Sequence, residues 1–166
     1  IPLYNERESL EPLVEWIDRV VKKSDLSHEI ILVDDGSKDD SWEVVRSLQK
    51  SFPSILGIKF RRNYGKAAAL HCGFDKAQGE VVITMDADLQ DSPDEIPELV
   101  RMIREDGLDL VSGWKKRDGR QAVTLDHLVV QIAHIFQIAG DAQHVGIGSD
   151  FDGGFGLQSA PAGIDT

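Results

Sequence analysis

The sequence has one cysteine, few aromatic residues and no apolar run long enough to cross a bilayer. A single cysteine, Cys72, excludes an internal disulfide and is expected to be a packing residue on a helix. A membrane-spanning helix needs about 20 predominantly apolar residues, so no transmembrane segment is expected. Since no charged-then-apolar leader opens the chain either, these features predict a cytoplasmic protein.

Charge and hydrophobicity set further limits. The 166 residues are 41% hydrophobic and carry a formal charge of −11, which predicts one folded domain over residues 1–166. An acidic chain is a poor partner for nucleic acid, because that binding depends on Lys and Arg side chains neutralising phosphates. A local cationic pocket for a small phosphate ligand remains compatible with this charge.

The composition changes abruptly near residue 117. Residues 1–117 hold 17 Lys and Arg and 23 Asp and Glu, whereas residues 118–166 hold one Arg, six Asp and neither Lys nor Glu. Glycine changes in the opposite direction, with 7 in the first part and 8 in the second. The break predicts that the domain consists of two segments of different origin, 1–117 and 118–166.

Apolar periodicity predicts helices alternating with short strands. Asn5 is expected to cap a helix that continues to Val21, and further helices are expected over about 40–52, 65–76 and 93–105. Strands are expected over 29–34, 55–60, 80–86 and 108–112. This alternation predicts an α/β fold, a three-layer, doubly wound, mostly parallel sheet of Rossmann-like type. Residues 1–3 resemble the end of a further strand.

Carboxylates follow two of the expected strands. Asp34 and Asp35 end one strand, and Asp86 and Asp88 end another. In open parallel sheets, ligands bind beyond the carboxyl ends of the strands, so two acidic strand ends favour a site for a cation or a polar ligand. The alternative is that these acids cap tight turns between strand and helix.

The segment Asp86-Ala-Asp88 with Gln90 is the most specific of these features. Alternate residues of an extended segment point the same way, so the three side chains are expected to converge oxygen ligands on one Mg²⁺ or Mn²⁺. Such cations usually keep water and bridge phosphates, which suits a nucleoside diphosphate.

Four blocks of residues 1–117 together resemble the family 2 glycosyltransferases, in particular those that transfer sugars to polyprenyl or dolichol phosphate. The blocks are Pro2-Leu-Tyr-Asn-Glu6, Val33-Asp-Asp-Gly-Ser37, Arg62-Asn-Tyr-Gly-Lys66 and Met85-Asp-Ala-Asp-Leu-Gln-Asp-Ser-Pro93. Their order and spacing also match. The resemblance implies the nucleotide-binding half of a GT-A fold, which binds a UDP- or GDP-type nucleotide-sugar.

The resemblance also implies roles for individual residues. Pro2, Tyr4 and Glu6 look like the loop against the base and ribose, and Asp35 resembles the acid that hydrogen-bonds the base. Gly65 and Lys66 match the turn that approaches the nucleotide, and the alternative for Lys66 is a solvated lysine at a helix start. The group that holds the diphosphate and the metal is matched by Asp86, Asp88 and Gln90. Basic residues near a phosphate site are matched by Lys115, Lys116 and Arg117, for which a solvated turn is as good an interpretation.

Residues 118–166 resemble a different family. A helix capped by Thr124 and ending at Gly140 is expected, followed by a strand over 144–149. The run His144-Val-Gly-Ile-Gly-Ser-Asp-Phe-Asp-Gly153 is similar to the membrane dipeptidases, zinc peptidases built on a TIM barrel, in which Asp150 matches an active-site aspartate. The barrel strands that would supply the metal ligands are missing, so His127, His134 and His144 are interpreted as solvated or packing residues and not as zinc ligands.

These observations favour a chimera, joined near residue 117. The helix–strand unit is expected to extend the sheet, and strand 144–149 is expected to supply missing strand pairing. Three functions are compatible with the sequence: a nucleotide-sugar and cation binding domain with little or no sugar transfer, which is preferred, a competent sugar transferase, or a folding module without a ligand. No catalytic residue can be named. The apolar strand could also pair between chains and form a homo-oligomer.

Overall fold

A computed structural model describes residues 1–112 and 145–147 of the chain. Two three-stranded parallel sheets form it, with strand orders β1-β2-β3 and β4-β6-β5. The strands are β1 Pro2–Leu3, β2 Ile30–Asp34, β3 Ile55–Lys59, β4 Val82–Thr84, β5 Leu110–Ser112 and β6 Val145–Ile147. The helices are α1 Leu10–Lys23, α2 Ser41–Ser51, α3 Lys66–Lys76 and α4 Ile96–Arg104, with the 3-10 turn η1 Pro93–Glu95 before α4.

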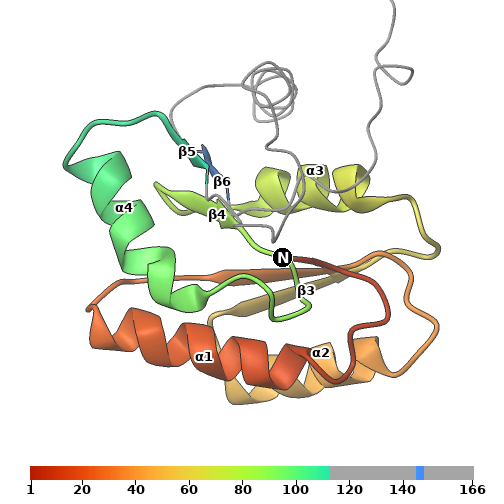
Figure 1. Cartoon of the computed structure of the whole chain (residues 1–166). Helices are drawn as coiled ribbons and strands as arrows, with labels where there is room; N and C mark the ends of the chain where they lie inside the picture. The colour runs from red at the N-terminus through yellow and green to blue at the C-terminus, as the bar shows by residue number, and fades with distance from the viewer. Residues whose placement is uncertain (113–144, 148–166) are drawn as a thin grey trace, which may run out of the picture.

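Helices cover both faces of the first sheet. Helices α1 and α2 lie against one face and α3 lies against the other, which confirms the expected three layers (Figure 1). Helix α4 follows η1 and packs against β5 and α1. The predicted α/β class with a parallel sheet is therefore confirmed.

The core lies mainly between α1 and β2. Leu10, Leu13 and Val14 of α1 are fully buried, as are Leu32 of β2 and Val45 of α2. Apolar residues three or four positions apart give α1 one continuous buried face, which is why this segment is helical and amphipathic. None of the helices in the described part of the chain has the length and apolar composition that crossing a bilayer requires.

Most predicted elements are present, with shorter strands at the second sheet. Strand β4 ends at Thr84, two residues before the predicted end at Asp86. The predicted cap of the first helix is wrong: Asn5 has a φ of 57° and lies in a loop, and α1 begins five residues later, after Ser9. Asn5 instead hydrogen-bonds to a loop distant in the sequence, which the local pattern could not reveal.

Strand β6 confirms that part of 144–149 pairs in a sheet. It lies between β4 and β5, with Val145 opposite both Val82 and Leu110. Both edges of β6 are thereby used within the chain, so we do not expect this strand to pair with a second copy. The predicted helix of residues 124–139 lies outside the described residues.

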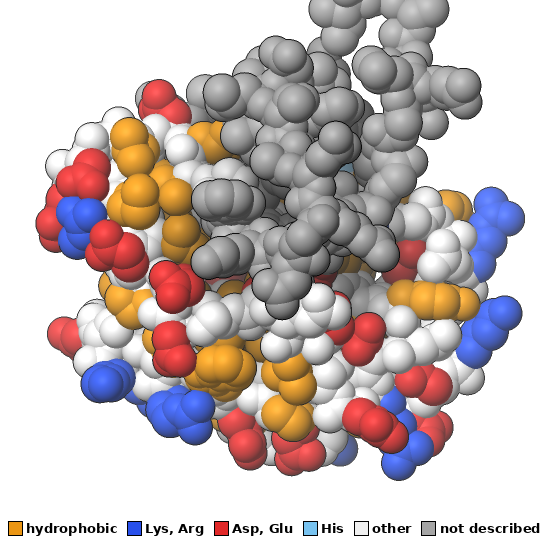
Figure 2. All heavy atoms as spheres, viewed as in Figure 1, with side chains coloured by type: hydrophobic (Ala, Val, Ile, Leu, Met, Phe, Trp, Pro, Cys, Tyr) orange, Lys and Arg blue, Asp and Glu red, His pale blue; other side chains and the backbone are white. Residues whose placement is uncertain are grey.

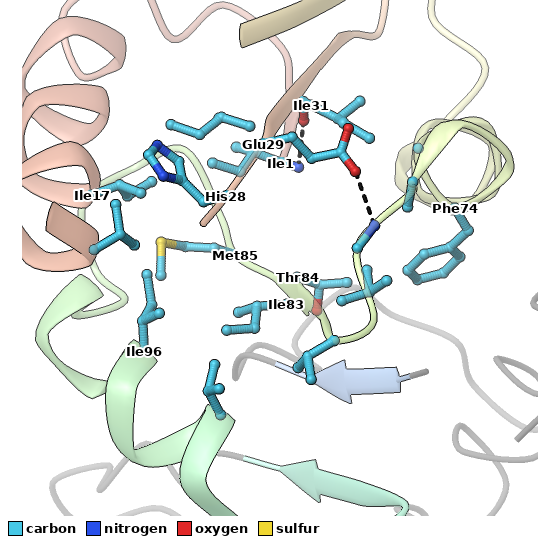
Figure 3. A pocket seen from close by; sticks show the side chains of 18 of the residues that line it. Ile1, Ile17, His28, Glu29, Ile31, Phe74, Ile83, Thr84, Met85 and Ile96 are labelled. Carbon is cyan, nitrogen blue, oxygen red and sulfur yellow. Dashed lines mark hydrogen bonds between the residues drawn. The ribbon is translucent and has the colours of Figure 1, made fainter. Parts of the chain in front are cut away.

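An apolar cavity of about 230 Å³ lies between the two sheets. Ile1 and Ile31 line it from the first sheet, and Ile83 and Met85 line it from the second (Figure 3). The Glu29 carboxylate at its edge accepts hydrogen bonds from the backbone N–H groups of residues 78 and 79, at 2.6 and 3.1 Å. None of the predicted metal ligands lines this cavity, so it is distinct from the predicted metal site.

The Ser41 hydroxyl joins two loops at the buried start of α2. It donates to the carboxylate of Asp39 and accepts from the backbone N–H of Glu6 at 2.9 Å. Desolvation acts to raise the pKa of Asp39, but hydrogen bonds from the side chain and backbone of Ser41, together with weaker backbone hydrogen bonds, outweigh it and lower that pKa.

We predict that Ser41→Ala destabilises the fold by about 1–3 kcal/mol, because the Glu6 N–H loses its acceptor in a partly buried position. Urea unfolding measures the change. Ser47→Ala, on the exposed face of the same helix, is the matched control and should change the free energy of unfolding by less than about 0.5 kcal/mol. Equal effects of the two substitutions would contradict the assignment.

Candidate functional site

Asp35 joins three segments at the carboxyl ends of the strands. Its backbone N–H donates to the carbonyl of Leu3 at 2.9 Å. Its carboxylate oxygens accept from the backbone N–H groups of Tyr64 at 2.7 Å and Gly65 at 2.8 Å. The residue is 4% exposed. Both oxygens are thus engaged by the chain itself, and a contact between Asp35 and a nucleotide base stays a prediction.

The neighbours of Asp35 shape the same turn. Asp34 is fully buried, and its Oδ1 accepts from the backbone N–H of Ser37 at 2.8 Å. Gly36 has a φ of 74°, and a Cβ there would lie 2.4 Å from the carbonyl carbon of Arg62. Only glycine allows this conformation together with such a close approach of two backbones. Asp34 therefore caps the tight turn between strand and helix, as the alternative interpretation of these acids predicted. The Asp34–Ser37 loop also packs closely against the loop after β3.

The loop between β1 and α1 is fixed to the same turn. The N–H of Asn5 donates to the hydroxyl of Ser37 at 2.9 Å, and its Oδ1 accepts from the N–H of Lys38 at 2.8 Å. The Glu6 carboxylate accepts from Ser9, while the ring of Tyr4 is 38% exposed. Sequence reasoning missed the role of Asn5, since its partners come from more than 30 positions away.

Lys66 and Asp86 form an ion pair between the two sheets. The ammonium Nζ lies 2.7 Å from Oδ1 and 2.9 Å from Oδ2 of Asp86. Lys66 thus supplies a positive charge that offsets the negative charge of Asp86.

The segment after β4 is a turn and not the extended segment that the spacing predicted. Leu89 has a φ of 64°, and the Oδ1 of Asp88 accepts from the N–H of Gln90 at 3.0 Å. Asp91 Oδ2 in turn accepts from the N–H of Asp86 at 3.0 Å. The argument from alternation was wrong because β4 stops short of these residues. Among residues 1–112 and 145–147, no group of three or more His, Cys, Asp or Glu side chains is arranged to hold a metal.

An exposed aromatic ring lies next to the turn held by Asp35. Tyr64 is 56% exposed, with the Arg62 guanidinium 4.9 Å from its ring centre and the Phe60 ring 5.7 Å away at a right angle. Sequence reasoning gave Tyr64 no role, although it stands between Asn63 and Gly65 in a block singled out there. The signal available in the sequence for such a role was an aromatic residue directly before a glycine that forms a turn.

The structure thus connects part of the predicted site. Hydrogen bonds run from β1 through Asp35 to Gly65, and the next residue, Lys66, forms an ion pair with Asp86. Acidic and basic side chains are scattered over the visible face of the molecule (Figure 2). Several predicted residues lie outside the described part of the chain: Lys115, Lys116, Arg117, His127, His134, His144 and Asp150.

The loops at the carboxyl ends of the parallel strands carry a cation and several carboxylates. Open α/β sheets bind their ligands at this edge. Comparison with known sequences gives the family. The profile of glycosyl transferase family 2 matches residues 1–153, and the chain belongs to this family.

Two curated relatives share nearly half of their matched residues with the chain. The undecaprenyl-phosphate 4-deoxy-4-formamido-L-arabinose transferase of Pseudomonas syringae pv. syringae is 46% identical over 112 residues. The enzyme of the same name from Yersinia pestis is 45% identical over 112 residues. The match covers 67% of this chain in both cases, but 33% and 34% of the relatives, so the chain spans about a third of their length.

Solved structures agree with the GT-A-like fold. The mannosyltransferase PcManGT from Pyrobaculum calidifontis, in complex with GDP-Man and Mn²⁺, is 27% identical with a TM-score of 0.55, over 63% of this chain and 31% of that one. Residues 1–349 of S. aureus TarS in complex with UDP are 21% identical with a TM-score of 0.56, over 74% of this chain and 36% of that one.

The family match also bears on the predicted junction. It runs across residue 117 and continues to residue 153. It therefore gives no support to a junction at 117 or to a dipeptidase-derived segment.

We predict that Asp35→Asn loosens the turn at Tyr64 and Gly65, because an amide can accept from only one of the two N–H groups. Loss of one buried acceptor costs about 1–3 kcal/mol. Hydrogen exchange should become faster at the amides of residues 64 and 65. Asp40→Asn is the control, since its ion pair with Arg7 is exposed and such pairs contribute at most about 1 kcal/mol. Unchanged exchange at residues 64 and 65 would contradict this role of Asp35.

Proposed function

We propose that this chain is the nucleotide-sugar-binding part of a glycosyltransferase that transfers a sugar from a nucleoside diphosphate to a polyprenyl phosphate. The family match and the names of the curated relatives support this reading. The observation that carries it is the Lys66–Asp86 pair beside the turn held by Asp35, because it places a cation and a carboxylate where the strands end.

The chemistry of the carboxylates that follow β4 suits a divalent cation, Mg²⁺ or Mn²⁺, because such ions prefer oxygen ligands. The Lys66 ammonium contacts both oxygens of Asp86, at the position that a metal cation bound to this carboxylate would take. Asp86 and Asp88, with Gln90, are the residues that would hold the metal. Two carboxylates leave most of the coordination to diphosphate oxygens and water, as is usual for Mg²⁺. Such a cation, when bound, neutralises negative charge on the diphosphate leaving group.

The chain's own residues supply binding and orientation. Asp35 fixes the backbone of Gly65, so the next residue, Lys66, starts from a defined position and extends its ammonium toward the diphosphate site. Pro2 lies in β1, and Tyr4 and Glu6 lie in the loop that follows it. Hydrogen bonds from the backbone of this loop to Ser37 and Ser41 hold it in place, which suits contacts with the base and ribose. Orientation of this kind lowers the barrier to transfer because fewer degrees of freedom are lost on reaction.

Two other readings predict different measurements. A binding domain without transfer would bind the nucleotide with metal and would not release labelled sugar to a lipid phosphate. A folding module without a ligand would bind neither. The comparisons match the chain to transferases and offer nothing in favour of either reading over transfer.

Calorimetry with UDP and GDP, with and without Mn²⁺, tests the binding site. We predict that nucleotide binding depends on the metal and that Asp88→Ala weakens it by at least roughly 10- to 100-fold. Loss of even an outer-shell partner of a metal has an effect of this size. Asp94→Ala removes an equal charge from an exposed residue nearby and is the matched control. Affinity that Asp88→Ala leaves unchanged would remove this residue from the metal site.

Transfer is then measured with a radiolabelled nucleotide-sugar and a polyprenyl phosphate in detergent. Metal-dependent labelling of the lipid supports transfer. Nucleotide binding without labelling would overturn the transferase reading for this chain and leave the binding domain. Absence of both binding and labelling would favour the folding module.

A further inference from the structure

Lys66 occupies the place on Asp86 that a chelated metal ion would need. Its ammonium lies within 2.9 Å of both carboxylate oxygens, so it straddles the group in the way a single cation does. A divalent ion coordinated by both oxygens cannot be present at the same time as this ammonium. The two cations therefore compete for one ligand.

The side chain of Lys66 is partly exposed, whereas the backbone before it is held. Gly65, the residue before it, is fixed through its N–H by the buried carboxylate of Asp35. The Lys66 side chain is 43% exposed, whereas that of Asp86 is 22% exposed. A long and partly exposed side chain on a fixed backbone can change partners without any change of the fold.

A nucleoside diphosphate would offer Lys66 such a second partner. Its phosphate oxygens carry more negative charge than one carboxylate and accept hydrogen bonds from an ammonium. When Lys66 moves to them, Asp86 becomes available to the metal, which itself bridges phosphate oxygens. Metal and nucleotide then each favour the binding of the other.

We infer that Lys66 is a resident counter-ion that blocks Asp86 against divalent metal until a nucleoside diphosphate draws the ammonium away. The inference rests on the proposed function and adds an order of events: metal alone binds weakly, and nucleotide with metal binds strongly. Because coupling between two ligands is reciprocal, Lys66 raises the dependence of nucleotide binding on metal as well.

The test measures Mn²⁺ binding to the whole chain without nucleotide, from the electron paramagnetic resonance signal of free Mn²⁺. Lys66→Gln should tighten Mn²⁺ binding roughly two- to fivefold, the range that a partly exposed ion pair contributes. Lys66→Arg, which keeps the charge, should not tighten it. Lys76→Gln removes the same charge from an exposed position at the other end of α3 and corrects for net charge.

The same variants are then titrated with UDP and with GDP in the presence of Mn²⁺. Lys66→Gln should weaken nucleotide binding while Mn²⁺ alone binds more tightly, and a purely structural lysine would not produce these opposite changes. If Lys66→Gln leaves Mn²⁺ binding unchanged or weaker while the wild type still binds nucleotide with metal, the counter-ion role is wrong and the proposed function stands. If the wild type binds no nucleotide with or without metal, both are wrong.

Discussion

The buried carboxylate of Asp35 accepts the backbone N–H groups of Tyr64 and Gly65, while the backbone of the same residue donates to Leu3. Strand β1, the end of β2 and the loop before α3 are joined at this residue. Burying a carboxylate costs free energy unless its oxygens are hydrogen-bonded. The two N–H groups therefore stabilise the buried Asp35, and Asp35 in turn fixes the turn at Tyr64 and Gly65. Lys66 follows Gly65 directly, so this arrangement also positions the residue that pairs with Asp86.

Part of the negative charge at the site is offset within the chain. The net charge of −11 suggested an excess of acid, yet Asp86 is neutralised by Lys66, and the acids of the Asp34–Ser37 turn are hydrogen-bonded to backbone N–H groups. The Lys66 ammonium therefore reduces the negative charge at this edge of the sheet without removing it, and among the described residues the Oδ2 of Asp34 is buried with no hydrogen-bond partner.

Several features were predictable because they depend on near neighbours in the chain. The apolar stripe of α1 and the β-branched run of β2 predicted those elements, and the acids after β2 and β4 predicted the edge at which the site lies. The geometry within the site was not predictable in the same way. The predictions of a helix cap at Asn5 and of an extended segment over residues 86–90 are wrong, because a local pattern contains neither the distant partner of Asn5 nor the end of β4.

The sequence by itself determined the α/β class, the family and the identity of the residues at the strand ends, since these follow from periodicity and from motifs whose members are close together. Tertiary structure alone decided that Asp35 supports a turn, that Lys66 covers both oxygens of Asp86, and that β6 lies between β4 and β5. The reason is physical: these interactions join residues 20 or more positions apart, and only the packing of strands and helices brings their atoms within hydrogen-bonding distance.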